Sequence, residues 1–162
     1  MVQRRSSAPA AVAPARETQG LIPSRTGARP ADVFIPRFAG RRDATLDVTV
    51  THPLQQGHLA GAAATAGHSL ILAYNRKVAG AGDECLAAGI AFIPLAVESL
   101  GGWHAVAVDT INRVAKAKAR HTGDLEEVIC RRSWQKLGLL VQKGNCALFN
   151  NRVPDVDKQD DK

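Results

Sequence analysis

The sequence predicts an α/β fold with a small mixed sheet flanked by helices, and three observations support this class. Apolar and polar residues alternate over 45–51, as in a strand with two different faces. Residues 90–97 form a continuous apolar run without charge, which is typical of a strand covered on both sides. Two helical patterns follow that run, so the predicted order is strand, strand, helix, strand, helix, helix.

Composition divides the chain into three expected parts. Residues 1–28 are rich in Arg, Ala and Pro and predict a flexible lead-in, with at most a short helix near 13–20. Residues 29–150 hold the predicted strands and helices and form the expected folded domain. Residues 151–162 carry four Asp and three basic residues, which predicts a charged, disordered tail.

The first two predicted strands, 32–36 and 45–51, are close enough in sequence to form a hairpin. The turn between them covers 37–43, contains a glycine and is short. In the second strand the residues alternate between an apolar face and a polar face. The apolar face has Leu46, Val48 and Val50, and the polar face has Thr45, Asp47 and Thr49.

The next predicted helix lies within the Ala-rich stretch 54–78 and is most strongly indicated over 69–78. Lys77 lies near its end. Gly80 and Gly82 follow directly, and each glycine costs about 1 kcal/mol of helix stability relative to Ala. We therefore expect the helix to be interrupted there and Lys77 to be weakly held.

Two helices are predicted after the apolar strand, and both lie near the C-terminal end of the chain. The first covers about 103–120 and follows a Gly-Gly turn. The second covers about 124–141. Asp124 with Glu127 three residues later resembles a capping box, so Asp124 is the predicted N-cap.

The formal net charge of +6 is unevenly distributed along the 162 residues. Residues 1–42 carry +6, residues 43–112 carry −4, and residues 113–143 carry +5. A metal-dependent nuclease needs such a distribution, with carboxylates for a cation and basic groups for phosphates. A solvated Arg-rich segment beside an ordinary domain explains the charge too, and charge alone favours that alternative. Aromatic residues make up only 4%, which argues against stacked aromatic platforms for single strands.

Cysteine use and hydropathy indicate the cellular setting. Cys85, Cys130 and Cys146 are widely spaced and form no CxxC pair, so we expect reduced thiols in an intracellular protein of the nucleus or cytoplasm. The five His form no zinc-binding motif. No apolar run approaches the roughly 20 residues of a membrane span, so we expect no membrane partner.

Two acids on the predicted hairpin, Asp32 and Asp47, are the main candidates for chemistry. Asp32 opens the first strand and Asp47 lies in the middle of the second, so pairing of the strands can bring both carboxylates to one edge of the sheet. Mg²⁺ relieves the repulsion between two such groups, and it can hold a scissile phosphate and activate water. The alternative is an edge-strand charge and a turn cap, which is the commoner role of two Asp in a hairpin.

A series of short motifs runs through residues 17–152 in a fixed order. The motifs are Arg29-Pro-Ala-Asp32-Val33, Ala44-Thr45-Leu-Asp47-Val-Thr-Val50, Phe92-Ile-Pro-Leu95, Glu98, Gly101-Gly102-Trp103, Leu137-Gly-Leu-Leu-Val-Gln142-Lys-Gly144-Asn145-Cys-Ala147 and Arg152. Their order resembles the restriction-endonuclease-like domain near the C-terminus of some non-LTR retrotransposon polyproteins, which also contain a reverse transcriptase. That domain belongs to the PD-(D/E)XK nuclease superfamily. The resemblance implies a restriction-endonuclease-like core, Mg²⁺-dependent hydrolysis of DNA phosphodiester bonds, and a chain that is a fragment of a retroelement.

The resemblance also assigns roles to individual residues. It implies that Asp32 and Asp47 bind the metal and that Glu17, on a preceding helix, is an auxiliary acid. The superfamily's lysine lies two residues after the second acid, where this chain has Thr49. In retroelement relatives the lysine comes from the following helix, and Lys77 matches that position as the third catalytic residue. An ordinary lysine whose amine extends to solvent is the equally weighted alternative.

The basic flanks supply candidate contacts to the phosphate backbone of DNA. These candidates are Arg29, Arg41, Arg42, Lys116, Lys118 and Arg120. Solvated helix faces explain such clusters as well. Two main hypotheses therefore stay open: a metal-dependent endonuclease-like domain, and a catalytically inactive remnant that keeps the fold and binds nucleic acid. A third, a non-functional reading frame, predicts poor folding on expression.

Overall fold

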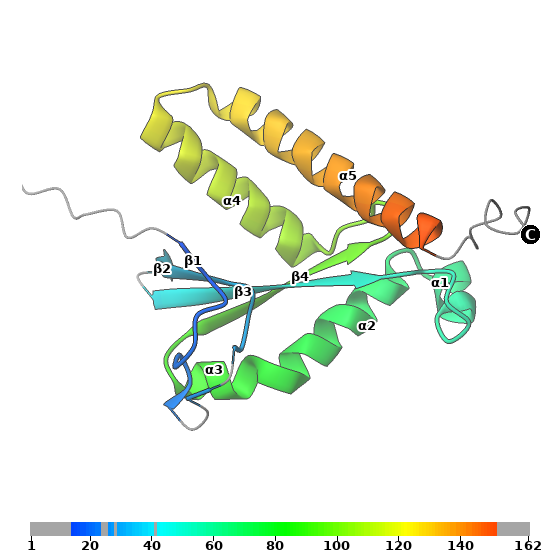
Figure 1. The fold of residues 1–162 in the computed structure, drawn as a ribbon, viewed down its shortest axis with the longest axis horizontal. Coiled ribbons are helices and arrows are strands. Elements are labelled where there is room, and N and C mark those ends of the chain that lie inside the picture. Colours follow the sequence, from blue (N-terminus) through cyan, green and yellow to red (C-terminus); the bar gives the residue numbers. More distant parts are fainter. Residues whose placement is uncertain (1–13, 24–25, 28, 41, 152–162) are drawn as a thin grey trace, which may run out of the picture. The chain divides into compact units, whose positions relative to one another are not determined.

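The computed structural model describes residues 14–23, 26–27, 29–40 and 42–151. Within these residues it confirms the α/β class, with a four-stranded sheet in the order β1-β2-β3-β4 (Figure 1). The elements are β1 (Ala15–Arg16), β2 (Val33–Ala39), β3 (Arg42–Thr51), α1 (Leu59–Ala64), α2 (His68–Lys77), the π-helix η2 (Val78–Gly82), α3 (Asp83–Ala87), β4 (Ala91–Glu98), α4 (Ala105–Thr122) and α5 (Glu126–Asn150).

The chain divides into two compact units. The first unit combines residues 1–48 with 76–94, and the second combines 49–75 with 95–162. Strands β3 and β4 and helix α2 continue from one unit into the other. Among the described residues, no helix is both long enough and apolar enough to cross a membrane.

The predicted hairpin is confirmed as the antiparallel pair β2–β3, in which Val33 lies opposite Leu46. Both strands are longer than expected, so the turn is shorter than 37–43. A bulge interrupts the register in β2, where Arg37 has a positive φ of 54°. The backbone N–H of Arg37 donates to Oδ1 of Asp43 at 2.9 Å, which fixes this irregular stretch to β3.

The region before β2 differs from the flexible lead-in with a short helix that its composition predicts. In the described residues of 13–20 there is no helix, and Ala15–Arg16 instead pairs antiparallel with β2. Ile22 is buried in a cluster with Cys85 and Ile90. An apolar side chain that reaches this cluster offsets the entropy cost of ordering a Pro- and Gly-rich segment.

The β4 strand confirms the apolar run at 90–97 and makes the sheet mixed. Helices connect β3 to β4, as a parallel pair requires. Where the two strands end, the N–H of Ser99, directly after β4, donates to the carbonyl of Thr51, the last residue of β3, at 2.9 Å. In the second unit Leu70 and Ala73 of α2 pack with Ala96 of β4, which explains the apolar face of this helix.

The burial of β3 is the reverse of what hydropathy alone suggests. The polar side of this strand, Thr45, Asp47, Thr49 and Thr51, is buried. On its apolar side, Leu46 is buried, whereas Val48 and Val50 are exposed, Val50 by 61%. A buried row of hydroxyl and carboxylate groups carries a desolvation cost. It therefore indicates that this strand has a role besides packing.

The helical run after α2 also differs from expectation. Gly80 and Gly82 do not interrupt it, because the chain continues through η2 into α3 with helical backbone angles at Lys77 and Asp83. The glycines are accommodated in a π-helix, a conformation that often marks functional sites. The expected weak hold on Lys77 is therefore wrong, since this residue lies inside a continuous helical segment.

The two predicted C-terminal helices are confirmed as α4 and α5, which lie side by side as a helical hairpin (Figure 1). Ala115, Ala119 and Ile129 form the buried contact between them. Gly123 ends α4 with a left-handed φ of 76°. The predicted N-cap is wrong: Leu125 occupies that position, and the carboxylate of Asp124 accepts instead from Thr122 Oγ1 at 2.7 Å.

Candidate active site

A contact between a strand acid and a helix lysine forms the centre of the candidate site. The Nζ of Lys77 lies 2.7 Å from Oδ2 of Asp47, and both residues belong to the first unit. The Asp47 side chain is only 11% exposed and the Lys77 side chain 34%. An ion pair shielded from water to this degree is stronger than a surface pair. Lys77 is therefore directed at the second predicted acid and does not simply extend into solvent.

Asp32 lies beside this pair in the hairpin. Because Val33 lies opposite Leu46, the next position of the same register sets Asp32 opposite Asp47. Side chains at directly opposed antiparallel positions leave the sheet on the same face. Asp32 is exposed, and its Oδ2 accepts from the backbone N–H of Val48 at 2.8 Å. The hydrogen bond orients the carboxylate across the hairpin, toward the strand that carries Asp47.

Glu17 contacts Asp32 through a backbone hydrogen bond and does not lie on a helix. It directly follows β1, and its N–H donates to the carbonyl of Asp32 at 2.9 Å. Its Oε2 lies 2.6 Å from a guanidinium nitrogen of Arg29. The resemblance implied that Glu17 lies on a helix, and this expectation is wrong. Glu17 also has a positive φ of 44°, which costs energy in a residue other than glycine.

Asp32 and Asp47 are the two candidate donors for a magnesium ion, which would keep part of its water shell. Within the described part of the chain, no group of three or more His, Cys, Asp and Glu side chains could hold a metal. Mg²⁺ usually binds through one or two carboxylates, with water and substrate phosphate as its other ligands. The contacts of Asp32 and Asp47 both use Oδ2, so Oδ1 of each is the oxygen that such an ion would take.

Thr49, at the position where the resemblance implied a lysine, is buried in β3. Its hydroxyl cannot carry the positive charge of an ammonium group. Lys77 supplies that charge to Asp47 from α2. The sequence alone suggested this arrangement, because it shows a threonine at position 49 and a lysine at position 77.

The residues predicted to contact nucleic acid differ in their exposure and in their ion pairs. Arg41 lies outside the described residues, and Arg42 is exposed at the start of β3. Arg29 is engaged with Glu17, and Lys116 lies 3.1 Å from Oε1 of Glu126. Lys118 and Arg120 are exposed on α4. The five described candidates are therefore not equally available, because Arg29 and Lys116 are engaged in ion pairs.

The second unit contains a buried polar contact that the sequence reasoning missed. Ser69 is fully buried, and its Oγ donates to Oε1 of Glu98 at 2.5 Å. The other carboxylate oxygen, Oε2, lies 2.5 Å from the position of a Cβ at Gly102. A side chain at position 102 would therefore displace the Glu98 carboxylate from its present position. The Gly-Gly pair just after an acid was the only signal of it in the sequence.

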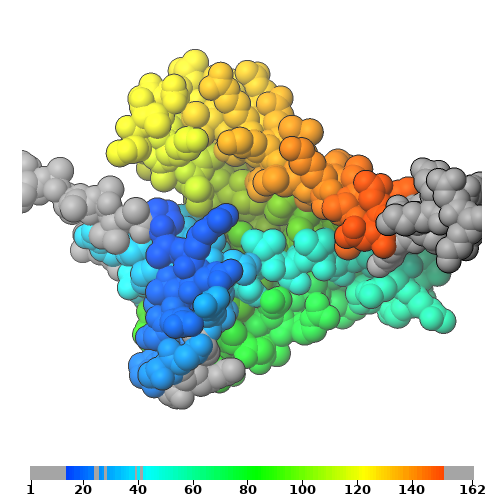
Figure 2. All heavy atoms as spheres, viewed as in Figure 1, coloured from blue at the N-terminus to red at the C-terminus, as the bar shows by residue number. Residues whose placement is uncertain are grey.

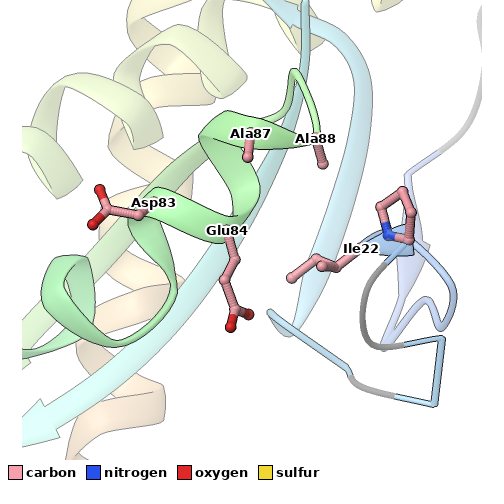
Figure 3. A pocket seen from close by; sticks show the side chains of 6 residues that line it. Ile22, Asp83, Glu84, Ala87 and Ala88 are labelled. Atoms are coloured by element: carbon pink, nitrogen blue, oxygen red, sulfur yellow. The ribbon is translucent and has the colours of Figure 1, made fainter.

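A shallow groove in the first unit is a weaker candidate. Ile22, Pro23, Ala87 and Ala88 give it apolar walls, and Asp83 and Glu84 contribute carboxylates. Figure 3 shows that the two carboxylates point in different directions, so they do not converge on one ion. Their surroundings supply no cation-binding geometry, and we assign this groove no role.

Comparisons with protein families, curated proteins and solved structures found no match for this chain. The family resemblance in the sequence thus stays a prediction, and function has to be argued from the side chains themselves.

Proposed function

We propose that the chain is a metal-dependent endonuclease-like domain that hydrolyses DNA phosphodiester bonds, with Asp32, Asp47 and Lys77 at its centre. The contact between Lys77 and Asp47 at 2.7 Å carries this proposal. The resemblance to retroelement nucleases requires a lysine from the helix to meet the second acid. A lysine used only for solubility has no reason to contact a carboxylate that is almost fully buried.

The roles of the acids follow from their positions. Asp47 and Asp32 would hold Mg²⁺ through their carboxylates, because they occupy opposed positions on one face of the hairpin. Bound Mg²⁺ would supply a Lewis acid for the phosphate and lower the pKa of a bound water. The hydrogen bond from Val48 holds Asp32 in one orientation, which limits the reorganisation needed for binding.

Lys77 would act on the reacting groups as a fixed cation. Its ammonium group can donate a hydrogen bond to the attacking water and balance the negative charge that develops on the phosphate. The salt bridge to Asp47 would hold the ammonium group close to the phosphate position. Preorganised charge of this kind stabilises a transition state without a reorganisation cost.

Glu17 would serve as an auxiliary acid. Its backbone bond to Asp32 keeps it next to the first ligand, and its strained φ is of the type that occurs at functional sites. In the structure its carboxylate is paired with Arg29. Both side chains are more than half exposed, so this pair costs little to break when another cation competes for Glu17.

A catalytically inactive remnant that binds nucleic acid is the second candidate. One observation favours it: the carboxylate of Glu17 is engaged by Arg29. In this case the ion pairs stabilise the fold in place of a metal. The two candidates differ in one property, which is the cleavage of DNA.

Nicking of supercoiled plasmid DNA tests the proposal. We expect the full chain to nick plasmid with Mg²⁺ and to lose this activity with a chelator or in the Asp47→Asn variant. The control is Asp109→Asn, which removes an exposed carboxylate of α4 and should nick like wild type. Equal nicking by Asp47→Asn and wild type would contradict the proposal. Salt-sensitive retention of DNA without nicking by wild type would favour the remnant.

A further inference from the structure

A groove on the α4–α5 hairpin has the chemistry of an anion-binding site. The helices present adjoining surfaces in Figure 2, coloured from yellow to orange. The groove lies entirely in the second unit and has a volume of about 440 Å³. It is lined by Lys118, Asp124, Ile129, Arg132, Ser133, Gln135, Lys136 and Leu139.

The charge of this groove is predominantly positive. Lys118 of α4 and Arg132 and Lys136 of α5 face a single acid, Asp124, which already accepts a hydrogen bond from Thr122. All three basic side chains are exposed, and within the described part of the chain none of them forms a salt bridge. Their charges are therefore available to an external anion.

The three cations are also arranged on a rigid frame. Arg132 and Lys136 are four residues apart on α5, which places them on one helix face about 6 Å apart along the axis. Buried Ile129 fixes the packing beneath them, and Ser133 donates to its carbonyl at 2.8 Å. An extended polyanion can therefore contact several of these charges at once.

We propose that this groove, defined by Lys118, Arg132 and Lys136, binds the phosphate backbone of duplex DNA. The inference rests on the proposed nuclease function, which supplies DNA as the polyanion. Exposed Arg and Lys side chains match phosphate oxygens, and the groove has no aromatic side chain on which a base could stack. Binding is thus expected to be independent of base sequence.

Lys116 illustrates why the groove, and not the whole basic helix, is the site. It lies on the same helix as Lys118, but it is paired with Glu126. DNA bound there would compete with Glu126 for the charge of Lys116. Net charge counts Lys116 and Lys118 alike, whereas the ion pair with Glu126 distinguishes them.

The test compares two variants of α5 that each lose one Arg and one Lys. Binding of a fluorescent duplex to the full chain is followed by anisotropy at several salt concentrations. Arg132→Ala/Lys136→Ala removes two groove cations, whereas Arg131→Ala/Lys143→Ala removes two exposed cations outside the groove lining. Since each phosphate contact contributes about 0.9 to the slope of log K against log salt, we expect the groove variant to lose about 2 units of slope and at least about 10-fold in affinity at low salt.

The control variant should keep nearly the slope of wild type, and circular dichroism verifies the fold of both. Equal losses in the two variants would overturn the proposal, because net charge would then explain the binding. Tighter binding to anionic phospholipid vesicles than to duplex DNA would overturn it too. The two proposals can fail separately. If wild type does not nick plasmid, but wild type and Asp47→Asn both bind duplex DNA through the groove, only the nuclease proposal fails.

Discussion

Oδ2 of Asp47 lies 2.7 Å from Nζ of Lys77, and this ion pair joins the middle of β3 to the last residue of α2. One partner is almost fully buried and the other is one-third exposed. The pair therefore has a structural role in addition to its role in the proposed reaction.

The stability of the fold should depend on this pair. Lys77→Met keeps a long apolar stem but leaves the carboxylate of Asp47 without its partner. Removing one partner of a fully buried pair costs about 3–5 kcal/mol, and the partial exposure of Lys77 reduces the expected loss to about 1–3 kcal/mol. Urea unfolding measures the change in the free energy of unfolding.

The matched control for that change is the double variant Asp47→Asn/Lys77→Met. It removes the buried charge together with its partner, so we expect it to be more stable than Lys77→Met alone. A double variant that loses the sum of the two single losses would show that the residues are not coupled.

Two glycines with open space around them but different backbone conformations should respond oppositely to the same substitution. Gly123 has a φ of 76° after α4, so Gly123→Ala should destabilise the protein by about 1 kcal/mol. Gly138 is inside α5 with open space around it, so Gly138→Ala should stabilise by up to about 1 kcal/mol. Thermal unfolding gives both signs, and a gain from Gly123→Ala would contradict the left-handed helix end.

Acidification should destabilise the second unit through His104. This ring stacks on Tyr74 at 4.2 Å, and its Nδ1 accepts from the N–H of Val106. Burial lowers the pKa of His104 below its ordinary 6.5, so the unfolded chain binds a proton at a higher pH than the folded one. Stability is then fully present above about pH 6.5 and is lost as the pH falls through the folded pKa.

The variant that isolates this effect is His104→Asn. Asparagine keeps a side chain able to cap α4 but has no proton to bind. Unfolding in urea at about pH 7 and about pH 5 should reveal a smaller loss of stability for the variant than for wild type. An identical loss in both proteins would assign the pH dependence to other groups.

The three thiols should react with iodoacetamide at different rates. Cys85 is buried beside Ile22 and Ile90, and burial raises the pKa of its thiol, whereas Cys146 is exposed. Because the thiolate is the reactive form, Cys146 should be modified first and Cys85 only after unfolding. Peptide mass spectrometry follows each site. Rapid labelling of Cys85 in the folded protein would contradict its place in the core.

Periodicity and apolar runs were sufficient to predict the hairpin, the α2 helix, the β4 strand and the C-terminal helices, because these elements are dominated by local patterns. Tertiary packing decided the rest. Hydropathy could not reveal that the polar side of β3 is buried, since an ion pair from α2 compensates Asp47. Nor could propensity reveal η2, in which helical hydrogen bonding continues past two glycines.

The candidate site was predictable to a similar extent. The sequence order of motifs suggested Lys77 as the partner of the second acid, and the contact with Asp47 agrees with that choice. The position of Glu17 was not predictable, because it depends on the pairing of β1 with β2 and on a backbone bond to Asp32. Contacts between segments distant in sequence leave no periodic signal.

Plasmid nicking by Lys77→Met tests the central claim most directly, because the nuclease proposal gives Lys77 a role in the reaction, whereas a purely structural role affects stability alone. With Mg²⁺, and at a temperature where circular dichroism verifies that both proteins are folded, we predict that the variant nicks at least about 100-fold more slowly than wild type while binding duplex DNA equally well. Wild-type nicking that is undiminished in Lys77→Met would contradict the account.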